Sequence, residues 1–198
     1  MLLEGKNLGF RYDGNDWLFR NLDVTVHSGE IVGLVGPSGC GKTTLGQVLA
    51  GHQLPVEGVI ALNGQALPRS GYHPVQLVFQ HPERAVNPRW RMSRVLDEGG
   101  IPDPAFMDAL GIQESWLQRT PSELSGGELQ RICIARALGG NARFLIADEM
   151  TTMLDAITQA QIWHAVLEAA KARNLGLLVI SHDQQLVERI CDRRISFW

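Results

Sequence analysis

The sequence has few of the features that mark secreted, zinc-binding or membrane-spanning proteins. Its only cysteines, Cys40, Cys133 and Cys191, lie far apart and form no CxxC pair. They support neither a disulfide framework nor a zinc site, and they are consistent with a reducing compartment. No stretch approaches the roughly 20 continuous apolar residues of a spanning helix, and the opening lacks a cationic start followed by an apolar signal core. We therefore expect the chain to stay in the cytosol.

The chain also lacks the positive charge of a typical nucleic-acid binder. Its formal net charge is -3, whereas proteins that neutralise phosphates usually carry a basic surface. With 198 residues, 44% hydrophobic and 20% charged, it has the composition of a globular chain with a buried core. We expect one domain with room for a small inserted subdomain, and no nucleic-acid partner.

The first fifty residues predict two kinds of β-structure. Leu18 to Val26 alternates apolar and polar residues and follows the turn signal Asp13-Gly14-Asn15, which favours an antiparallel edge sheet. Ile31 to Val35 is a short apolar run ending near glycine, and Lys42 to Ala50 is compatible with a helix. Strand, loop and helix in this order indicate the start of a parallel core.

Further apolar runs predict additional strands. Val59 to Leu62 and Val75 to Phe79 have the character of strands, and Phe144 to Ala147 and Leu177 to Ile180 are typical of strands buried on both faces of a parallel sheet.

The segments between these runs are expected to be helical. In Ala156 to Arg173 apolar residues recur at helical spacing, and Asp155 is placed as its cap, so this is a crossover helix. From about His81 to Thr120 prolines and arginines mix with short helical pieces such as Pro104 to Leu110. We interpret this region as an inserted helical subdomain, and no linker separates a second domain.

One glycine-rich segment predicts nucleotide binding. Gly36 to Thr43 matches GxxxxGK[ST], in which backbone N–H groups surround phosphates, Lys42 reaches the outer phosphates and Thr43 binds magnesium. The strand before it and the helix after it are the context that this motif requires. The motif alone does not distinguish a kinase, a GTPase or a motor. The predicted nucleotide-binding residues of this loop are Gly36, Pro37, Ser38, Gly39, Cys40, Gly41, Lys42, Thr43 and Thr44.

A second motif makes that distinction. Leu124 to Arg131 reads LSGGELQR, which resembles the LSGGQ signature of ABC ATPases with Glu128 in the place of glutamine. The same residues also form an S-x-x-E capping box that opens a helix, and both interpretations hold together. The apolar side of that helix would include Leu129, Ile132, Cys133 and Ala137. In the family, the helix start formed here by Ser125, Gly126, Gly127 and Glu128 meets the γ-phosphate bound by the opposite subunit.

Other segments match the family's order of motifs. Phe144 to Glu149 resembles the Walker B strand, which implies Asp148 in the magnesium shell and Glu149 beside the attacking water. Met153-Leu154-Asp155 resembles the D-loop, although Met153 replaces a small residue, which puts communication between the two sites in doubt.

The remaining candidate residues also come from this resemblance. His182 is similar to the switch histidine that contacts the γ-phosphate, and Gln80 to the Q-loop glutamine that links magnesium and water to the membrane partner. Tyr12 lies where the family places an aromatic ring that stacks on adenine, and an exposed loop tyrosine is the competing interpretation.

The chain is identified as a member of the ABC ATPases from Tyr12 to His182. The resemblance implies an α/β fold: a P-loop NTPase core with a mostly parallel sheet, an N-terminal antiparallel β subdomain and an inserted helical signature subdomain. The core is expected at about 1–80 and 141–198 and the helical subdomain at about 81–140. The resemblance implies that the catalytic residues are Glu149, His182 and Gln80. It implies that the residues that bind Mg²⁺ are Thr43, Gln80 and Asp148.

The family resemblance also implies partners and a subcellular location. These partners are a second ATPase subunit, identical or paralogous, transmembrane permease subunits and an extracytoplasmic substrate-binding protein. The subunit would lie peripherally at the cytoplasmic face of the membrane and be soluble when isolated.

The type of transporter depends on weaker signals. Gln80 to Arg89 resembles the region after the Q-loop in peptide and nickel importer ATPases, while Gln80-His81-Pro82 is also similar to energy-coupling ATPases for metals and vitamins. The sequence ends at Ile195-Ser196-Phe197-Trp198, and we expect it to lack the C-terminal extension frequent among peptide importers. The basic residues after the Q-loop have two interpretations: they bind acidic groups of a permease, or they form a solvated face. They are Arg84, Arg89, Arg91 and Arg94.

Two alternatives to a transport motor remain. A soluble ABC ATPase of DNA repair or translation is disfavoured because such proteins resemble fused pairs or carry long insertions. A non-hydrolysing subunit of an asymmetric pair is disfavoured by the presence of Glu149 and His182.

Overall fold

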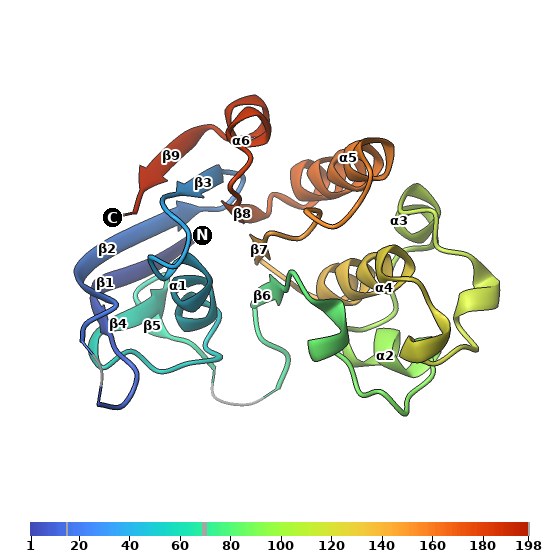
Figure 1. Ribbon diagram of the computed structural model, residues 1–198, viewed down its shortest axis with the longest axis horizontal. Helices are drawn as coiled ribbons and strands as arrows, with labels where there is room; N and C mark the ends of the chain where they lie inside the picture. The colour runs from blue at the N-terminus through green and yellow to red at the C-terminus, as the bar shows by residue number, and fades with distance from the viewer. Residues whose placement is uncertain (15, 69–70, 198) are drawn as a thin grey trace. The chain divides into compact units, whose positions relative to one another are not determined.

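The computed structural model describes residues 1–14, 16–68 and 71–197, and the chain divides into two units (Figure 1). The sheet unit comprises Met1–Leu77, Arg143–Asp148 and Asn174–Trp198, and the helical unit comprises Val78–Ala142 and Glu149–Arg173. The chain therefore leaves the sheet unit and returns to it twice.

The first strands of the sheet unit form an antiparallel sheet in the order β2-β1-β4-β5. In β2, the buried residues Phe19, Val24 and Val26 are separated by exposed ones, which is the alternation of a strand with one face on the core. The expected N-terminal antiparallel sheet is confirmed. Asn15 of the predicted turn lies outside the described residues. The strands are β1 (Leu2–Phe10), β2 (Phe19–His27), β4 (Glu57–Leu62) and β5 (Gln65–Ala66).

The second sheet has the order β6-β7-β8-β3-β9, and the pairs β7–β8, β3–β8 and β3–β9 are parallel. Every residue of β7 and β8 is buried, as expected for strands covered on both faces. The mostly parallel core predicted from the apolar runs is therefore confirmed. The strands are β3 (Ile31–Val35), β6 (Val75–Val78), β7 (Phe144–Asp148), β8 (Gly176–Ile180) and β9 (Arg193–Ser196).

Helices α1 (Lys42–Leu49) and α6 (Gln184–Ile190) cover opposite faces of this parallel sheet. A Cβ on Gly46 of α1 would lie 2.9 Å from the side chain of Ile180, whereas a Cβ on Gly33 of β3 would lie 2.5 Å from Val187 of α6. Ile180 pairs with Leu34, the neighbour of Gly33, and neighbouring strand residues point to opposite faces. Glycine therefore lets both helices approach the sheet closely.

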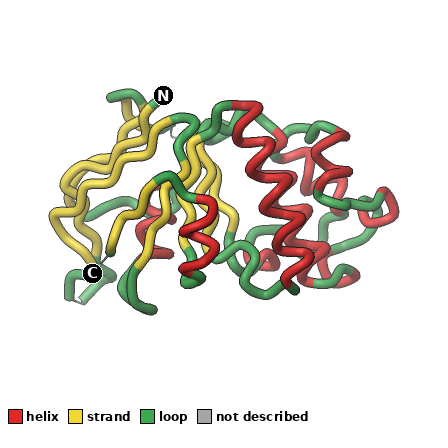
Figure 2. The backbone as a smooth tube through the Cα atoms, turned by 90° about the horizontal axis from the view of Figure 1, so that it is seen from above, coloured by secondary structure: helices red, strands yellow, loops and turns green. Residues whose placement is uncertain are grey.

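The helical unit is built around α4 (Gly126–Gly139), with α2 (Met92–Glu98) packed against it and α3 (Pro104–Ala109) packed against α5 (Ala156–Arg173). Figure 2 shows these helices in red, joined by green loops. The loops contain three short 3₁₀ turns, η1 (Pro82–Arg84), η2 (Glu114–Trp116) and η3 (Pro121–Glu123).

The predicted crossover helix forms with the expected ends, and the predicted helical piece Pro104 to Leu110 forms as α3, which ends at Ala109. The crossover helix has the bounds Ala156–Arg173, and the Asp155 carboxylate accepts hydrogen bonds from the backbone N–H groups of Ile157 (3.1 Å) and Thr158 (3.0 Å). These bonds hold the pKa of Asp155 below its ordinary value, the Thr158 bond being the larger cause. None of the helices in the described residues combines the length and the apolar character needed to cross a membrane.

Candidate active site

The loop between β3 and α1 follows a path that requires glycine at Gly36, Gly39 and Gly41. A Cβ on Gly36 would lie 2.1 Å from the carbonyl oxygen of Phe197, and Gly39 and Gly41 have φ angles of 80° and 106°. No side chain caps α1, and its first turn carries no acidic residue. The positive end of the helix dipole therefore faces the loop, which suits an anion.

Lys42, the first residue of α1, places a cation inside this loop. Its Nζ atom donates hydrogen bonds to the carbonyl oxygens of Gly36 (2.8 Å) and Pro37 (2.7 Å), and the residue is only 9% exposed. The ammonium group is thus held where the loop backbone would surround phosphates.

Two of the predicted magnesium ligands are in direct contact. The Thr43 hydroxyl donates a hydrogen bond of 3.1 Å to Asp148 Oδ1, and Asp148 is 3% exposed at the end of β7. A hydroxyl and a carboxylate form an oxygen-only donor set of the type that Mg²⁺ prefers, so these residues fit the ion. The third predicted ligand, Gln80, belongs to the helical unit.

His182 lies at the same edge of the parallel sheet as the phosphate loop. Ile180, two residues before it, pairs with both Leu34 of β3 and Asp148 of β7, so the loops that follow β3, β7 and β8 leave the sheet side by side. This is the carboxyl edge at which open α/β sheets bind ligands. The register of the sheet therefore brings together the phosphate loop, Asp148 at the end of β7 and the loop that carries His182, which are far apart in the sequence.

Tyr12 extends toward the start of α1. Its hydroxyl lies 3.2 Å from Thr44 Oγ1, its ring contacts Phe10 edge-on at 5.1 Å, and the residue is 47% exposed. The neighbouring Trp17 instead lies under the guanidinium groups of Arg11 and Arg20, at 4.9 and 4.6 Å. An exposed ring beside the phosphate loop is what adenine stacking requires, which favours Tyr12 for this role.

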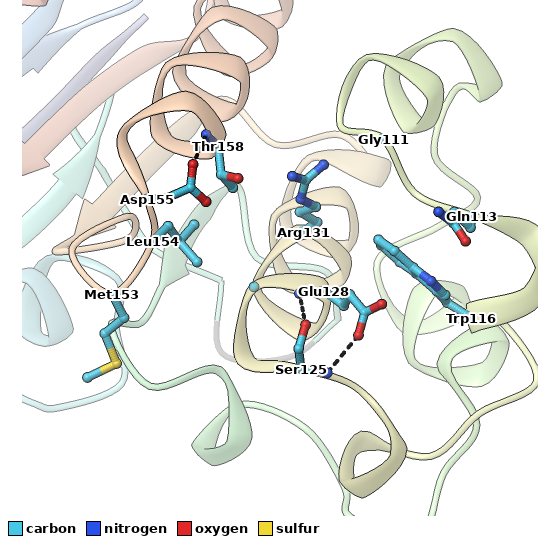
Figure 3. Close-up of a pocket in the computed structure, with 11 residues that line it drawn as sticks. Gly111, Gln113, Trp116, Ser125, Glu128, Arg131, Met153, Leu154, Asp155 and Thr158 are labelled. Atoms are coloured by element: carbon cyan, nitrogen blue, oxygen red, sulfur yellow. Dashed lines mark hydrogen bonds between the residues drawn. The ribbon is translucent and has the colours of Figure 1, made fainter.

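In the helical unit, the predicted capping box opens α4 (Figure 3). The backbone N–H of Ser125 donates to Glu128 Oε2 (2.7 Å), and the backbone N–H of Glu128 donates to Ser125 Oγ (3.3 Å). The bond from the Ser125 backbone lowers the pKa of Glu128. The expected apolar side of the helix, which includes Leu129 and Ile132, is buried.

A cavity of about 420 Å³ opens in front of this helix start (Figure 3). The start of α4 forms one wall, the segment before and at the beginning of α5 forms another, and the loop around η2 closes it. The signature segment and the segment that resembles the D-loop therefore line the same cavity. The lining residues are Gly111, Gln113, Trp116, Ser125, Gly127, Glu128, Arg131, Met153, Leu154, Asp155 and Thr158.

Ser125→Ala is expected to lower the free energy of unfolding by about 1 kcal/mol, because the Glu128 N–H loses its acceptor. Ser125→Asn, which supplies another capping oxygen, should stay close to the wild-type value. Urea unfolding of the three proteins measures the difference. Equal stability of Ser125→Ala and the wild type would show that this cap contributes nothing.

Gln80 follows β6 and lies beside the signature segment of its own chain. Gln80, Gly126 and Gly127 line a second cavity of about 240 Å³. Gln130 of α4 donates a hydrogen bond of 3.1 Å to the carbonyl oxygen of Phe79 and so ties α4 to the residue before Gln80. Gln130 Oε1 is the only buried side-chain polar atom of the described residues without a hydrogen-bond partner.

Glu149, the predicted catalytic carboxylate, has an unusual backbone conformation. Its φ angle is 50°, in the left-handed region that residues with side chains seldom adopt. Its Oε2 atom accepts a hydrogen bond of 2.5 Å from the Thr152 hydroxyl. A turn in which the Thr152 N–H donates to the Glu149 carbonyl (3.2 Å) brings the two residues together.

The structure thus places the predicted site residues in two groups. The sheet unit contains Tyr12, the phosphate loop, Asp148 and His182, and the helical unit contains Gln80, the signature segment and Glu149. Sequence reasoning did not select Gln130 or Thr152. The only signal for Thr152 was its position three residues after Glu149, a spacing that matters only in a turn.

Comparisons with known proteins agree on one family. A family model described as ABC transporter matches residues 19–152. The nickel import system ATP-binding protein NikE of Staphylococcus aureus (strain bovine RF122 / ET3-1) is 36% identical over 98% of this chain and 85% of its own length. Among solved structures, the ATP-binding subunit of an ABC transporter superposes with a TM-score of 0.84 at 23% identity, covering 100% of this chain and 86% of that one. A bacterial ABC transporter cassette solved as a dimer gives a TM-score of 0.83 at 23% identity, with 98% and 94% coverage.

Proposed function

This chain belongs to the ABC transporter family, as an ATP-binding subunit that hydrolyses ATP, and from that membership we propose that it powers the import of nickel ions. The observation that carries the proposal is the 36% identity to a nickel import ATP-binding protein over 98% of this chain. The residues from Gln80 to Arg89 support the same class of importer.

The hydrolysis reaction follows from the groups at the site. Lys42 and the N–H groups of the loop bind the outer phosphates. Thr43 and Asp148 would hold Mg²⁺, which would supply positive charge to the phosphate oxygens. Glu149 accepts a proton from water as the water oxygen bonds to the γ-phosphorus. The bond from that phosphorus to the bridging oxygen breaks, and ADP and phosphate leave. Gln80 and His182 assist by contacts to the water and the γ-phosphate.

Two ATPase subunits are proposed to complete each site. The signature segment lines an open cavity of about 420 Å³ at the start of α4, where the positive end of the helix dipole lies. In the proposed pair, this segment of one subunit meets the γ-phosphate bound by the other. ATP then favours the closed pair, because its binding energy includes both subunits only when they close.

The closing motion is proposed to reach a permease through the expected helical subdomain at about 81–140, while the expected core at about 1–80 and 141–198 binds nucleotide. Of that expected core, Glu149–Arg173 belongs to the helical unit of the structure. The basic residues after the Q-loop, Arg84, Arg89, Arg91 and Arg94, are exposed and are proposed to contact the permease. Arg94 lies over the Trp90 ring at 3.9 Å. The subunit would then work at the cytoplasmic face of the membrane, with an extracytoplasmic substrate-binding protein delivering the cargo.

Deletion of the gene in its own organism is expected to reduce uptake of radioactive Ni²⁺ at limiting concentration. The wild-type gene should restore uptake, and Glu149→Gln should not. Uptake of a labelled dipeptide is measured in parallel. Loss of dipeptide uptake with normal Ni²⁺ uptake would replace nickel by peptide as the cargo, and no change in either would contradict an import role for these cargoes.

A further inference from the structure

We propose that Thr152 is a positioning residue for ATP hydrolysis, whose hydroxyl holds the Glu149 carboxylate in the orientation that receives the proton from water. This inference rests on the proposed role of Glu149. It adds a residue that contacts neither nucleotide nor metal in the mechanism above and acts only through Glu149.

The hydrogen bond itself is the first argument. The Thr152 Oγ1 and Glu149 Oε2 atoms are 2.5 Å apart, a distance typical of a hydroxyl bonded to an ionised carboxylate. Such bonds are about twice as strong as bonds between neutral groups. A glutamate side chain has three rotatable bonds, so fixing one oxygen removes most of its orientational freedom.

The backbone of Glu149 is the second argument. A non-glycine residue at φ 50° is strained and persists only where its surroundings hold it. The Thr152 N–H bond to the Glu149 carbonyl (3.2 Å) and the hydroxyl bond to the Glu149 side chain both span this residue. Backbone and side chain are therefore held by the same threonine.

The loop that carries Thr152 is anchored at both ends. On one side, the Thr151 hydroxyl is buried and accepts a hydrogen bond of 3.1 Å from Nε1 of Trp163 in α5. On the other side, Asp155 caps the first turn of α5. Thr152 itself is exposed, so its side chain is not required for core packing. We therefore expect the protein to fold normally when the Thr152 hydroxyl is removed. The role that we assign to this hydroxyl is its hydrogen bond to Glu149.

The test compares Thr152→Val, which removes the hydroxyl and keeps the shape, with Thr152→Ser, which keeps the hydroxyl. Thr152→Val is expected to lower kcat about tenfold or more, since small misplacements of a reacting group cost up to about 10²-fold, and to leave KM for ATP within about twofold. Thr152→Ser should retain most of kcat. Thr25→Val makes the same change at an exposed position of β2 and should behave as the wild type.

A double-mutant cycle with Glu149→Gln separates positioning from a general structural effect. If Thr152 acts through Glu149, Thr152→Val has little further effect on the residual single-turnover rate of Glu149→Gln. Equal losses in both backgrounds, a wild-type kcat in Thr152→Val, or a Thr152→Ser as slow as Thr152→Val would each overturn the inference. Thermal melting confirms folding, and Thr152→Ala repeats the test if Thr152→Val melts lower. Wild-type turnover in Glu149→Gln alone would instead reject the proposed role of Glu149.

Discussion

Glu149→Gln is expected to bind ATP with nearly wild-type affinity and to lose turnover by about 10²- to 10⁴-fold, the range typical of a general base. The amide is close to the carboxylate in size, so it can occupy the turn beside Thr152, but it cannot accept the proton from water. Because ATP is retained and not cleaved, closed pairs of the subunit should accumulate. Phosphate release measures turnover, and size-exclusion chromatography with ATP measures pairing.

Glu168→Gln provides the matched control for this experiment. Glu168 is an exposed residue of α5 in the same unit, so the substitution changes the charge equally at a position away from the site. We expect wild-type turnover and no accumulation of pairs. Full turnover in Glu149→Gln would show that another group accepts the proton, and equal loss in Glu168→Gln would indicate a charge effect.

The parallel core could be predicted from sequence because its strands are unbroken apolar runs. Phe144 to Ala147 and Leu177 to Ile180 form β7 and β8, each longer by one residue, since only a strand covered on both faces excludes polar side chains so completely. The bounds of α5 were also predictable, because the apolar spacing and the Asp155 cap agree.

The strand β9 and the position of β4 in its sheet could not be predicted from the sequence. The strand β9, Arg193 to Ser196, alternates half-buried and exposed residues over only four positions, so no apolar run marks it. Its pairing with β3 depends on a crossover through α6, and local sequence does not encode which strand it will join. The place of β4 in the antiparallel sheet likewise follows from its pairing with β1.

The site shows the same division between local and long-range information. The glycines of the phosphate loop could be predicted because their spacing is a local sequence motif. The reason that Gly36 must be glycine is visible only in the folded structure, where a Cβ would collide with the carbonyl oxygen of Phe197. The contact between Thr43 and Asp148 spans 105 residues and was expected only from family resemblance. The bond from Thr152 depends on a positive φ at Glu149, which residue type does not reveal.

Lys42→Ala is expected to weaken ATP binding by at least about tenfold to a hundredfold, since a hydrogen bond to a charged group contributes about 1.5–3 kcal/mol and the ammonium adds attraction to the triphosphate. The loop carbonyls of Gly36 and Pro37 also lose their donor, so the loop becomes less ordered. Both effects act before the chemical step. Binding of a fluorescent ATP analogue at constant ionic strength therefore measures the loss directly.

Lys171→Ala is the control, because Lys171 is exposed on α5 and its removal changes the net charge by the same amount. Its affinity for ATP should equal that of the wild type, which isolates the local contribution of Lys42 from the overall charge of the chain. The comparison with Glu149→Gln then separates two steps: loss of Lys42 prevents binding, whereas loss of the Glu149 carboxylate stops the reaction after binding. Full affinity in Lys42→Ala would mean that the loop between β3 and α1 does not hold the phosphates, and the proposed site would have to be sought elsewhere.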